Sequence, residues 1–138
     1  MKGSMKTFDE LRETFEFLPD WMDRYAVIID LGKALPAAPE GLHDDRYKVT
    51  GCMSQVWVRA ELDGGVMRYQ GDSDAAIVRG LIAVLFLALQ GKEPSEVLAF
   101  DLEQAFAELG LSSNLSPNRR NGFYSMIGVM KESAAQFA

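Results

Sequence analysis

Apolar residues recur at helical spacing at the start of the chain, and this pattern predicts two helices before residue 36. Thr7 and Glu10 form a capping-box pattern that begins the first helix, and Asp20 is suited to cap the second. Gly32 is placed to end the second helix, and residues 36–46 then read as a loop. The apolar positions of the two helices are Phe8, Leu11, Phe15 and Leu18, followed by Trp21, Tyr25, Ile28 and Leu31.

From residue 56 onward the apolar positions alternate with a period of two, which is typical of a half-buried β-strand. Val56, Val58 and Ala60 alternate with Trp57, Arg59 and Glu61. The Asp-Gly-Gly sequence at residues 63–65 supplies a hairpin turn, so residues 66–70 are predicted to return as the next strand. We expect a third strand at residues 47–50.

The remainder of the chain is predicted to be helical. A long apolar helix ends at Gln90, with Asp72 or Ser73 as its cap and Gly91 as its stop. Three more helices are expected, starting at Pro94, at Asp101 and at Ser116-Pro117. Two helices, then strands, then four helices indicate an α+β fold, in which a small three-stranded antiparallel sheet is packed by helices on one face.

A chain of 138 residues is long enough for one domain with its own core. Hydrophobic residues make up 48% and charged residues 25%, a composition typical of a globular protein rather than a disordered one. We assign residues 6–138 to a single domain. We interpret residues 1–5, where a Gly-Ser pair precedes a second methionine, as a cloning scar.

The charge balance and the apolar stretches exclude two classes of partner. Acidic residues outnumber basic ones by 20 to 14, which argues against a nucleic-acid binder because such a protein needs a basic surface. The longest apolar stretch, residues 75–89, is too short to span a bilayer and contains Arg79. A single cysteine cannot form an internal disulfide and no secretory signal is visible, so we expect a cytoplasmic protein.

Cys52, the only cysteine, follows Gly51 at a turn that precedes the strand pattern. A free cysteine is often a small buried hydrophobe, but a thiol at a loop tip is within reach of a partner. The chain has no second cysteine for dithiol redox chemistry and lacks the ligand set of a structural zinc site. His43, the only histidine, lies in the predicted loop and is interpreted as solvated. These exclusions leave a thiolate that accepts a group and hands it on.

Two carboxylates and one guanidinium are further candidates. Asp72 and Asp74 suit the first turn of a helix, where the macrodipole favours negative charge. Pairing across the 63–65 turn would place them at the same end of the sheet as Cys52, where they could hold the cysteine loop through its backbone N–H groups. Arg119 lies in the first turn of the last helix, against the dipole, which indicates either a partner carboxylate or a solvated position.

Five blocks of residues together resemble the SufE family of sulfur-acceptor proteins, and they span nearly the whole chain. The blocks are Trp21 with Arg24-Tyr25; IIDLG at 28–32 with Leu35-Pro36; GCMSQVW at 51–57; GDSDAAIVRG at 71–80; and Leu115-Ser116-Pro117 with Arg119 and Gly122. The residues after the cysteine, Met53-Ser54-Gln55, look more like SufE proper than like the related CsdE branch. One departure is that many members have an asparagine shortly before the cysteine, where Tyr47-Lys48 stand in this chain.

The resemblance implies a fold similar to that of the IscU scaffold and a role in iron–sulfur cluster assembly. SufE-like proteins accept persulfide sulfur from a SufS-like cysteine desulfurase, stimulate that enzyme, and pass the sulfur to a SufB-containing scaffold complex. By this resemblance Cys52 is the sulfur acceptor. No cofactor is expected on this chain, because pyridoxal phosphate belongs to the desulfurase. A weak homodimer is the only self-association that we allow for.

We expect six residues to support the cysteine loop, namely Gly51, Ser54, Gln55, Asp72, Asp74 and Arg119. Whether His43 or Arg119 assists transfer is left open by the sequence. Three rival interpretations also stay open at this point. They are a one-cysteine thiol enzyme such as a peroxidase, with Arg119 beside the thiol; a module that regulates the desulfurase without carrying sulfur; and a structural domain with an inert core cysteine.

Overall fold

The protein is described from a computed structural model, in which residues 7–138 are the described part, so the interpretation of residues 1–5 as a cloning scar lies outside it. Within residues 7–138 the chain forms seven α-helices, one 3-10 turn and a two-stranded sheet. The elements are α1 (Phe8–Glu16), α2 (Trp21–Lys33), η1 (Asp45–Tyr47), β1 (Val56–Asp63), β2 (Val66–Ser73), α3 (Ala76–Leu89), α4 (Pro94–Ala99), α5 (Leu102–Glu108), α6 (Leu111–Asn114) and α7 (Pro117–Ala135). The predicted α+β class is confirmed.

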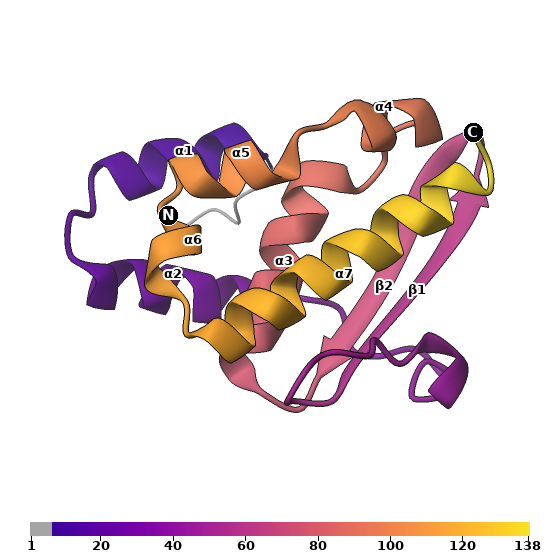
Figure 1. Cartoon of the computed structure of the whole chain (residues 1–138), viewed down its shortest axis with the longest axis horizontal. Helices are drawn as coiled ribbons and strands as arrows, with labels where there is room; N and C mark the ends of the chain where they lie inside the picture. Colours follow the sequence, from indigo (N-terminus) through magenta and orange to yellow (C-terminus); the bar gives the residue numbers. More distant parts are fainter. Residues whose placement is uncertain (1–6) are drawn as a thin grey trace.

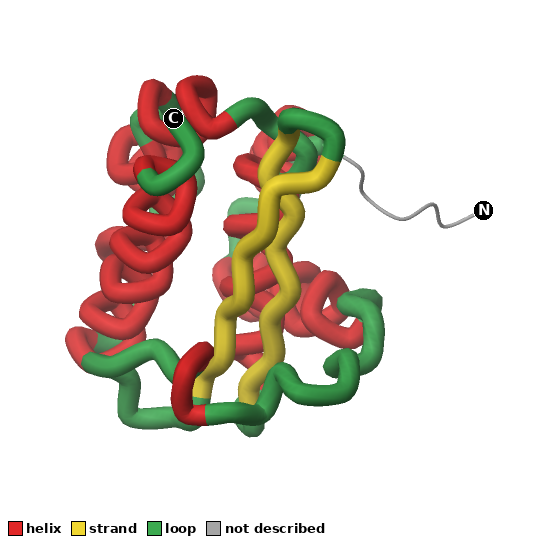
Figure 2. The backbone as a smooth tube through the Cα atoms, turned by 90° about the vertical axis from the view of Figure 1, so that its right-hand side faces the viewer, coloured by secondary structure: helices red, strands yellow, loops and turns green. Residues whose placement is uncertain are grey.

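The two strands form an antiparallel hairpin in which Val56 pairs with Ser73 and Asp63 pairs with Val66. Gly64 and Gly65 both have positive φ angles, 60° and 87°, which is the combination a two-residue type I′ turn requires. The backbone pairing places alternate residues of both strands on one face, and the buried strand residues lie mostly on it. Figure 2 shows the two strands running side by side as a long, narrow ribbon.

The prediction of a third strand at residues 47–50 is wrong. Tyr47 belongs to η1, and the segment meets the sheet only through an isolated bridge between Lys48 and Trp57. In that bridge the Val49 N–H donates to the Val56 carbonyl at 2.8 Å. Gly51, with a φ of 89°, then turns the backbone, so no extended run of residues remains to continue the pairing.

Helices cover one face of the hairpin, as predicted. α3 packs against β2, while α7 packs against β1. In Figure 1 α3 lies in the middle of the molecule, between the hairpin on one side and α1 and α2 on the other. Gly71 in β2 allows a close approach, because a Cβ there would lie 2.9 Å from Ile82 Cγ2 and 3.1 Å from Phe86 Cζ. The buried Tyr69 hydroxyl donates to the Met130 carbonyl at 3.0 Å and thereby ties β2 to α7.

The sequence predicted that Gly32 ends the second helix, but α2 continues to Lys33. The function of Gly32 is packing. α2 and α3 cross so closely that a Cβ on Gly32 would lie 2.5 Å from the backbone nitrogen of Gly80. A pair of glycines therefore lets the two helix backbones touch, which fixes α3 firmly against α2.

The predicted caps are right at four helices and wrong at α3. Side chains cap α1, α2, α5 and α7 at the four expected positions, Thr7, Asp20, Asp101 and Ser116. Asp72 and Ser73 instead belong to β2, and the N-cap of α3 is Ala75, which makes no side-chain cap hydrogen bond. The sequence analysis also missed the four-residue α6 after Gly110. In the described part of the chain, none of the helices combines the length and the apolar character needed to cross a membrane.

Candidate functional site

The loop that carries Cys52 lies between the isolated bridge and the start of β1. Two physical reasons favour glycine at position 51, directly before the cysteine. The φ of Gly51, 89°, is in the left-handed region that side chains rarely adopt, and a Cβ at this position would lie 2.6 Å from the Ser125 hydroxyl oxygen. The loop therefore turns sharply and lies directly against α7, which carries Ser125.

The Cys52 side chain is half-buried and points toward α7. Its Sγ lies 3.7 Å from the Gly122 carbonyl oxygen. A Cβ at Gly122 would lie only 3.1 Å from this sulfur, so the missing side chain of Gly122 leaves the space in which the thiol is seated. Gly122 is one α-helical turn from Ser125, and the same face of α7 thus accommodates both Gly51 and Cys52.

Burial raises the pKa of the Cys52 thiol above its ordinary value of 9.0. Near neutral pH the seated side chain is therefore a protonated thiol. Since the thiolate is the nucleophile in sulfur chemistry, this seat lowers the reactive fraction of Cys52.

A cavity of about 270 Å³ opens beside Cys52 and reaches the surface. Its apolar wall comes from the start of β1 and from the facing sides of α3 and α7, through Val56, Val78, Leu81, Phe123 and Met126. Its polar residues are Ser54, Ser116, Asn118 and Arg119. The thiol is thus placed at the wall of a mostly apolar cavity that is far larger than one additional sulfur atom.

Asp74 holds the C-terminal end of the cysteine loop. Its carboxylate accepts a hydrogen bond from the Gln55 N–H at 3.1 Å, and its own N–H donates to the Gln55 carbonyl at 3.3 Å. These two bonds extend the hairpin by one step beyond Val56. Asp74 is therefore placed where the sequence analysis expected a carboxylate to hold the loop, whereas Asp72 is not.

Asp72 lies on the opposite face of the hairpin and binds His43 and Arg79. His43 Nε2 lies 2.6 Å from Asp72 Oδ2, and the Arg79 guanidinium donates to Oδ1 of the same carboxylate. Arg79 also donates to the Gly32 carbonyl at the end of α2. Burial alone would raise the pKa of Asp72, but the His43 hydrogen bond, the Ser73 N–H and the Arg79 charge together lower it.

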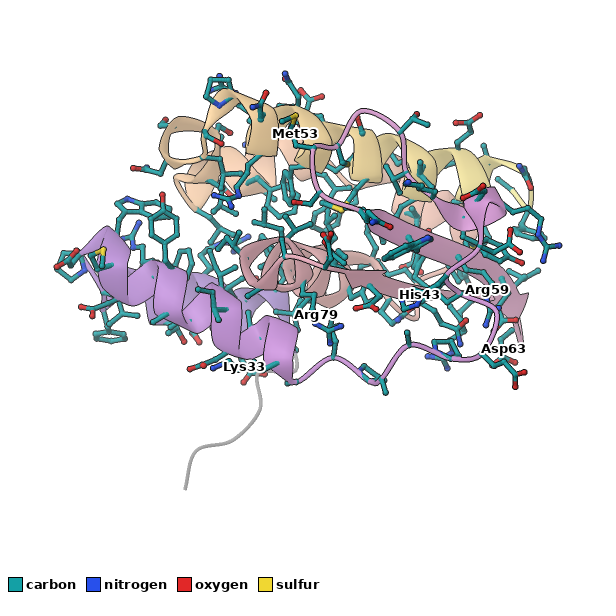
Figure 3. All side chains as sticks on the ribbon, turned by 90° about the horizontal axis from the view of Figure 1, so that it is seen from below. Lys33, His43, Met53, Arg59, Asp63 and Arg79 are labelled. Atoms are coloured by element: carbon teal, nitrogen blue, oxygen red, sulfur yellow. The ribbon has the colours of Figure 1, made fainter. Side chains whose placement is uncertain are left out.

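His43 is therefore partnered rather than simply solvated, although its side chain is still half-exposed. Its ring also packs on Trp57, with ring centroids 4.3 Å apart. In Figure 3 Met53 lies next to α7, away from His43 and Arg79. The structure thus separates His43 and Asp72 from the Cys52 cavity and gives them a role in fastening residues 36–47 to the sheet.

Arg119 lies in the first turn of α7 and lines the cavity. Its backbone N–H is bound by the Ser116 cap, and its side chain makes no ion pair with any residue between 7 and 138. Its neighbour Arg120 instead donates to the Ser112 carbonyl at 2.9 Å. The positive charge near Cys52 is consequently available to a ligand or partner.

Sequence reasoning missed the structural importance of Gly122, Ser125 and Met53. Gly122 and Ser125 belong to a helix, and only tertiary packing shows that their small size creates the seat of the cysteine loop. Met53 carried a visible signal, because a large apolar residue at a predicted loop tip is unusual. Among residues 7–138, no group of three or more histidine, cysteine or carboxylate side chains is arranged to hold a metal ion.

Comparisons with known proteins show which family this chain resembles. The family model of SufE, described as an Fe-S metabolism associated domain, matches residues 9–134. An uncharacterized SufE-like protein of Rhizobium etli is 43% identical over 134 residues, which cover 94% of this chain and 90% of the relative. Another, from Rhizobium meliloti, is 40% identical over 134 residues and is covered to 96%. A solution structure of a hypothetical protein from Thermus thermophilus has a similar fold, with a TM-score of 0.77, 22% identity, and coverage of 94% of this chain and 93% of that one.

Proposed function

The chain belongs to the SufE family, which is associated with iron–sulfur metabolism, and on that premise we propose that Cys52 accepts persulfide sulfur from a cysteine desulfurase. The protein then passes the sulfur to a SufB-containing scaffold and stimulates the desulfurase by clearing its persulfide. In this proposal the chain is a carrier and not a stand-alone enzyme.

The observation that carries the proposal is the seat of Cys52. A single thiol is located on a loop that is pinned at Val49 and at Gln55, and it points into a mostly apolar cavity at the surface. A persulfide is reactive toward other thiols, so a carrier benefits from covering it between the two transfers. The cavity beside Sγ has space for one more sulfur atom, and its apolar wall shields one side of that atom.

The transfer is a thiol–persulfide exchange. The Cys52 thiolate attacks the terminal sulfur of the enzyme persulfide, and a new S–S bond forms on Sγ. The S–S bond on the desulfurase breaks at the same time, and its cysteine leaves as a thiolate. The proton lost by Cys52 passes to solvent or to this leaving thiolate, and no electrons are gained or lost overall.

Because burial lowers the thiolate fraction of the seated Cys52, the reaction is favoured when Cys52 leaves its seat. We propose that the desulfurase draws the loop away from Gly122, which returns the thiol to water and removes the cause of its raised pKa. Arg119 is the cavity residue that can stabilise the thiolate or the incoming persulfide, because its charge is not neutralised within the described chain.

Mass spectrometry of the intact protein tests sulfur carriage directly. The chain is incubated with its desulfurase, pyridoxal phosphate and L-cysteine, without reductant. We expect a gain of one or more sulfur atoms that maps to Cys52 and is lost on reduction. An unmodified Cys52 in the presence of an active, bound desulfurase would refute the transfer step.

The Cys52→Ser variant separates carriage from regulation. If the chain only regulates the desulfurase, this variant still stimulates it; if the chain clears the persulfide, stimulation is lost. The stand-alone peroxidase has less support, because such an enzyme needs a cysteine of low pKa, whereas burial raises the pKa of Cys52.

Hydrogen exchange tests the movement of the loop. Adding the desulfurase is expected to change amide exchange over residues 50–55, because the backbone leaves α7 and contacts the partner. The N–H groups of α3 serve as the internal control, since that helix is held by α2 and the sheet. Unchanged exchange at residues 50–55 in the complex would show that the loop stays seated.

A further inference from the structure

Met53 follows the acceptor cysteine and is one of the most exposed large apolar residues in the described part of the chain. Its side chain is 82% exposed, although it borders the Cys52 cavity. Figure 3 shows Met53 on the loop beside α7. By contrast, the described methionines of the core, Met67, Met126 and Met130, are at most 2% exposed. An apolar side chain at this position contributes nothing to the core and is available for contact.

The position of Met53 makes it part of any surface that delivers sulfur to Cys52. A partner thiol must approach within bonding distance of Cys52 Sγ, and it then also covers the adjacent Met53. A methionine is suited to such a contact, because its unbranched thioether adapts to irregular surfaces. This step rests on the proposed function.

We propose that Met53 is a site of reversible oxidation that blocks sulfur delivery to Cys52. The oxidant is hydrogen peroxide. The Met53 thioether sulfur attacks one peroxide oxygen, an S–O bond forms, the O–O bond breaks, and the other oxygen leaves as water. The thioether is oxidised by two electrons and the peroxide is reduced by two. A thiol-dependent methionine sulfoxide reductase reverses the change, with two thiols oxidised to a disulfide and the sulfoxide oxygen released as water.

Met53 is more exposed to a dissolved oxidant than the other methionine of the cavity. Peroxide oxidises thiolates, but the half-buried Cys52 is protonated in its seat. The thioether of Met53 needs no deprotonation and is open to solvent. Met126, which lines the same cavity, is protected by burial. Met53 is therefore more accessible to peroxide than Met126, and reduction with a thiol separates its sulfoxide from any oxidised form of Cys52.

Oxidation changes the contact from apolar to polar. The sulfoxide oxygen is a strong hydrogen-bond acceptor, and burying it without a donor against an apolar partner surface is unfavourable. We expect sulfur transfer to fall roughly tenfold, which is the scale of effect expected from one buried polar group without a partner.

The test uses peroxide and two matched variants. The full chain is treated with hydrogen peroxide, quenched, and reduced with dithiothreitol, which restores sulfenic acid and disulfide forms of Cys52 but leaves methionine sulfoxide intact. Met53→Leu removes the oxidisable sulfur at similar volume. Met22→Leu is the matched control, because Met22 is 74% exposed and lies at the start of α2, away from the cavity.

Each sample is compared with its own untreated form for sulfur gain on Cys52 in the presence of the desulfurase and L-cysteine. We expect about a tenfold loss for the wild type and for Met22→Leu, no loss for Met53→Leu, and recovery of the wild type with the reductase. Equal loss in Met53→Leu, or peptide mapping that finds Met53 intact, would overturn the inference. If the untreated wild type gains no sulfur, the proposed function and this inference both fail. If the untreated and the oxidised wild type gain sulfur equally, this inference alone is wrong.

Discussion

Replacing Gly122 with alanine is expected to release Cys52 from its seat. The added Cβ would lie 3.1 Å from Cys52 Sγ, and 3.6 Å and 3.7 Å from Cβ and Cα of the same residue. Favourable contacts between carbon atoms lie at about 3.5–4.0 Å, so the contact with the sulfur is too short by roughly 0.4–0.9 Å. Rotation of the thiol or lifting of the loop relieves the overlap, and both responses move Sγ away from α7.

The size of the effect follows from the cost of overpacking. An extra methyl group in a well-packed site costs about 1–3 kcal/mol when the neighbours keep their positions. This cost applies only to the seated state, so the population of released Cys52 rises roughly 5- to 150-fold. The whole protein is not expected to lose stability to the same extent, because alanine in a helix interior is favoured over glycine by about 1 kcal/mol.

The rate at which Cys52 reacts with a bulky aromatic disulfide reagent reports the released population. Gly128→Ala is the matched control, since Gly128 lies in the same helix and a Cβ there would meet nothing within 4 Å. Gly122→Ala should react at least several-fold faster than the wild type, and Gly128→Ala should react at the wild-type rate. Equal rates for all three proteins would show that the seat against Gly122 does not restrain the thiol.

Three further outcomes follow from individual contacts. Asp74→Ala should speed amide exchange over residues 50–55 by removing a hydrogen bond worth about 0.5–1.5 kcal/mol, while Asp74→Asn, which keeps an acceptor for the Gln55 N–H, should stay near the wild type. The rate of Cys52 alkylation by iodoacetamide should rise with pH around a midpoint above that of the denatured chain, because burial raises the pKa of the folded thiol; coinciding midpoints would contradict this. Burial also raises the pKa of Tyr69 from 10.0 to about 12, so the folded state keeps a proton that the unfolded state loses in this range. The free energy of unfolding should be unaffected by Tyr69 below pH 10 and should fall by about 1.4 kcal/mol per pH unit from there to pH 12, a slope that Tyr69→Phe should lack in urea titrations.

Features that depend on local chemistry were predictable from the sequence. Thr7, Asp20, Asp101 and Ser116 cap helices in the structure because a short side chain reaches the next backbone N–H groups without help from the rest of the fold. The hairpin was predictable for the same reason, since two successive glycines at residues 64–65 fit the turn that connects paired strands.

Features that depend on tertiary contacts were not predictable in the same way. Gly32 looks like a helix stop but is a contact point for α3, and nothing in the neighbouring residues distinguishes the two roles. Asp72 resembles a helix cap, yet strand pairing carries β2 through it and directs its carboxylate to His43 and Arg79. Residues 47–50 alternate like a strand, but the turn at Gly51 ends the pairing after one bridge.

The candidate site likewise has features that were predictable from the sequence and features that depend on tertiary contacts. The sequence indicated Cys52 as the reactive residue. The predicted pairing of the strands also placed Asp74 near the cysteine loop, and in the structure its carboxylate accepts from the Gln55 N–H. The sequence could not show that the thiol is seated against Gly122, because the two residues are far apart in the chain and meet only when α7 packs on β1. The raised pKa of Cys52 is likewise a property of the packed loop and not of the residues next to it.

Two hydrogen-bonded residues anchor the ends of the cysteine loop and limit how far Cys52 can move. Val49 is bonded to Val56 on one side, and Gln55 is bonded to Asp74 on the other. Cys52 is three residues from each anchor, and three fully extended residues span about 10 Å. In the proposed transfer, the Cys52 sulfur therefore moves only a short distance while both anchors hold. Under the proposed function, a donor or an acceptor whose reactive atom lies at the bottom of a deep, narrow cleft is out of range while both anchors hold, so each partner would have to present its reactive sulfur close to the surface of this protein.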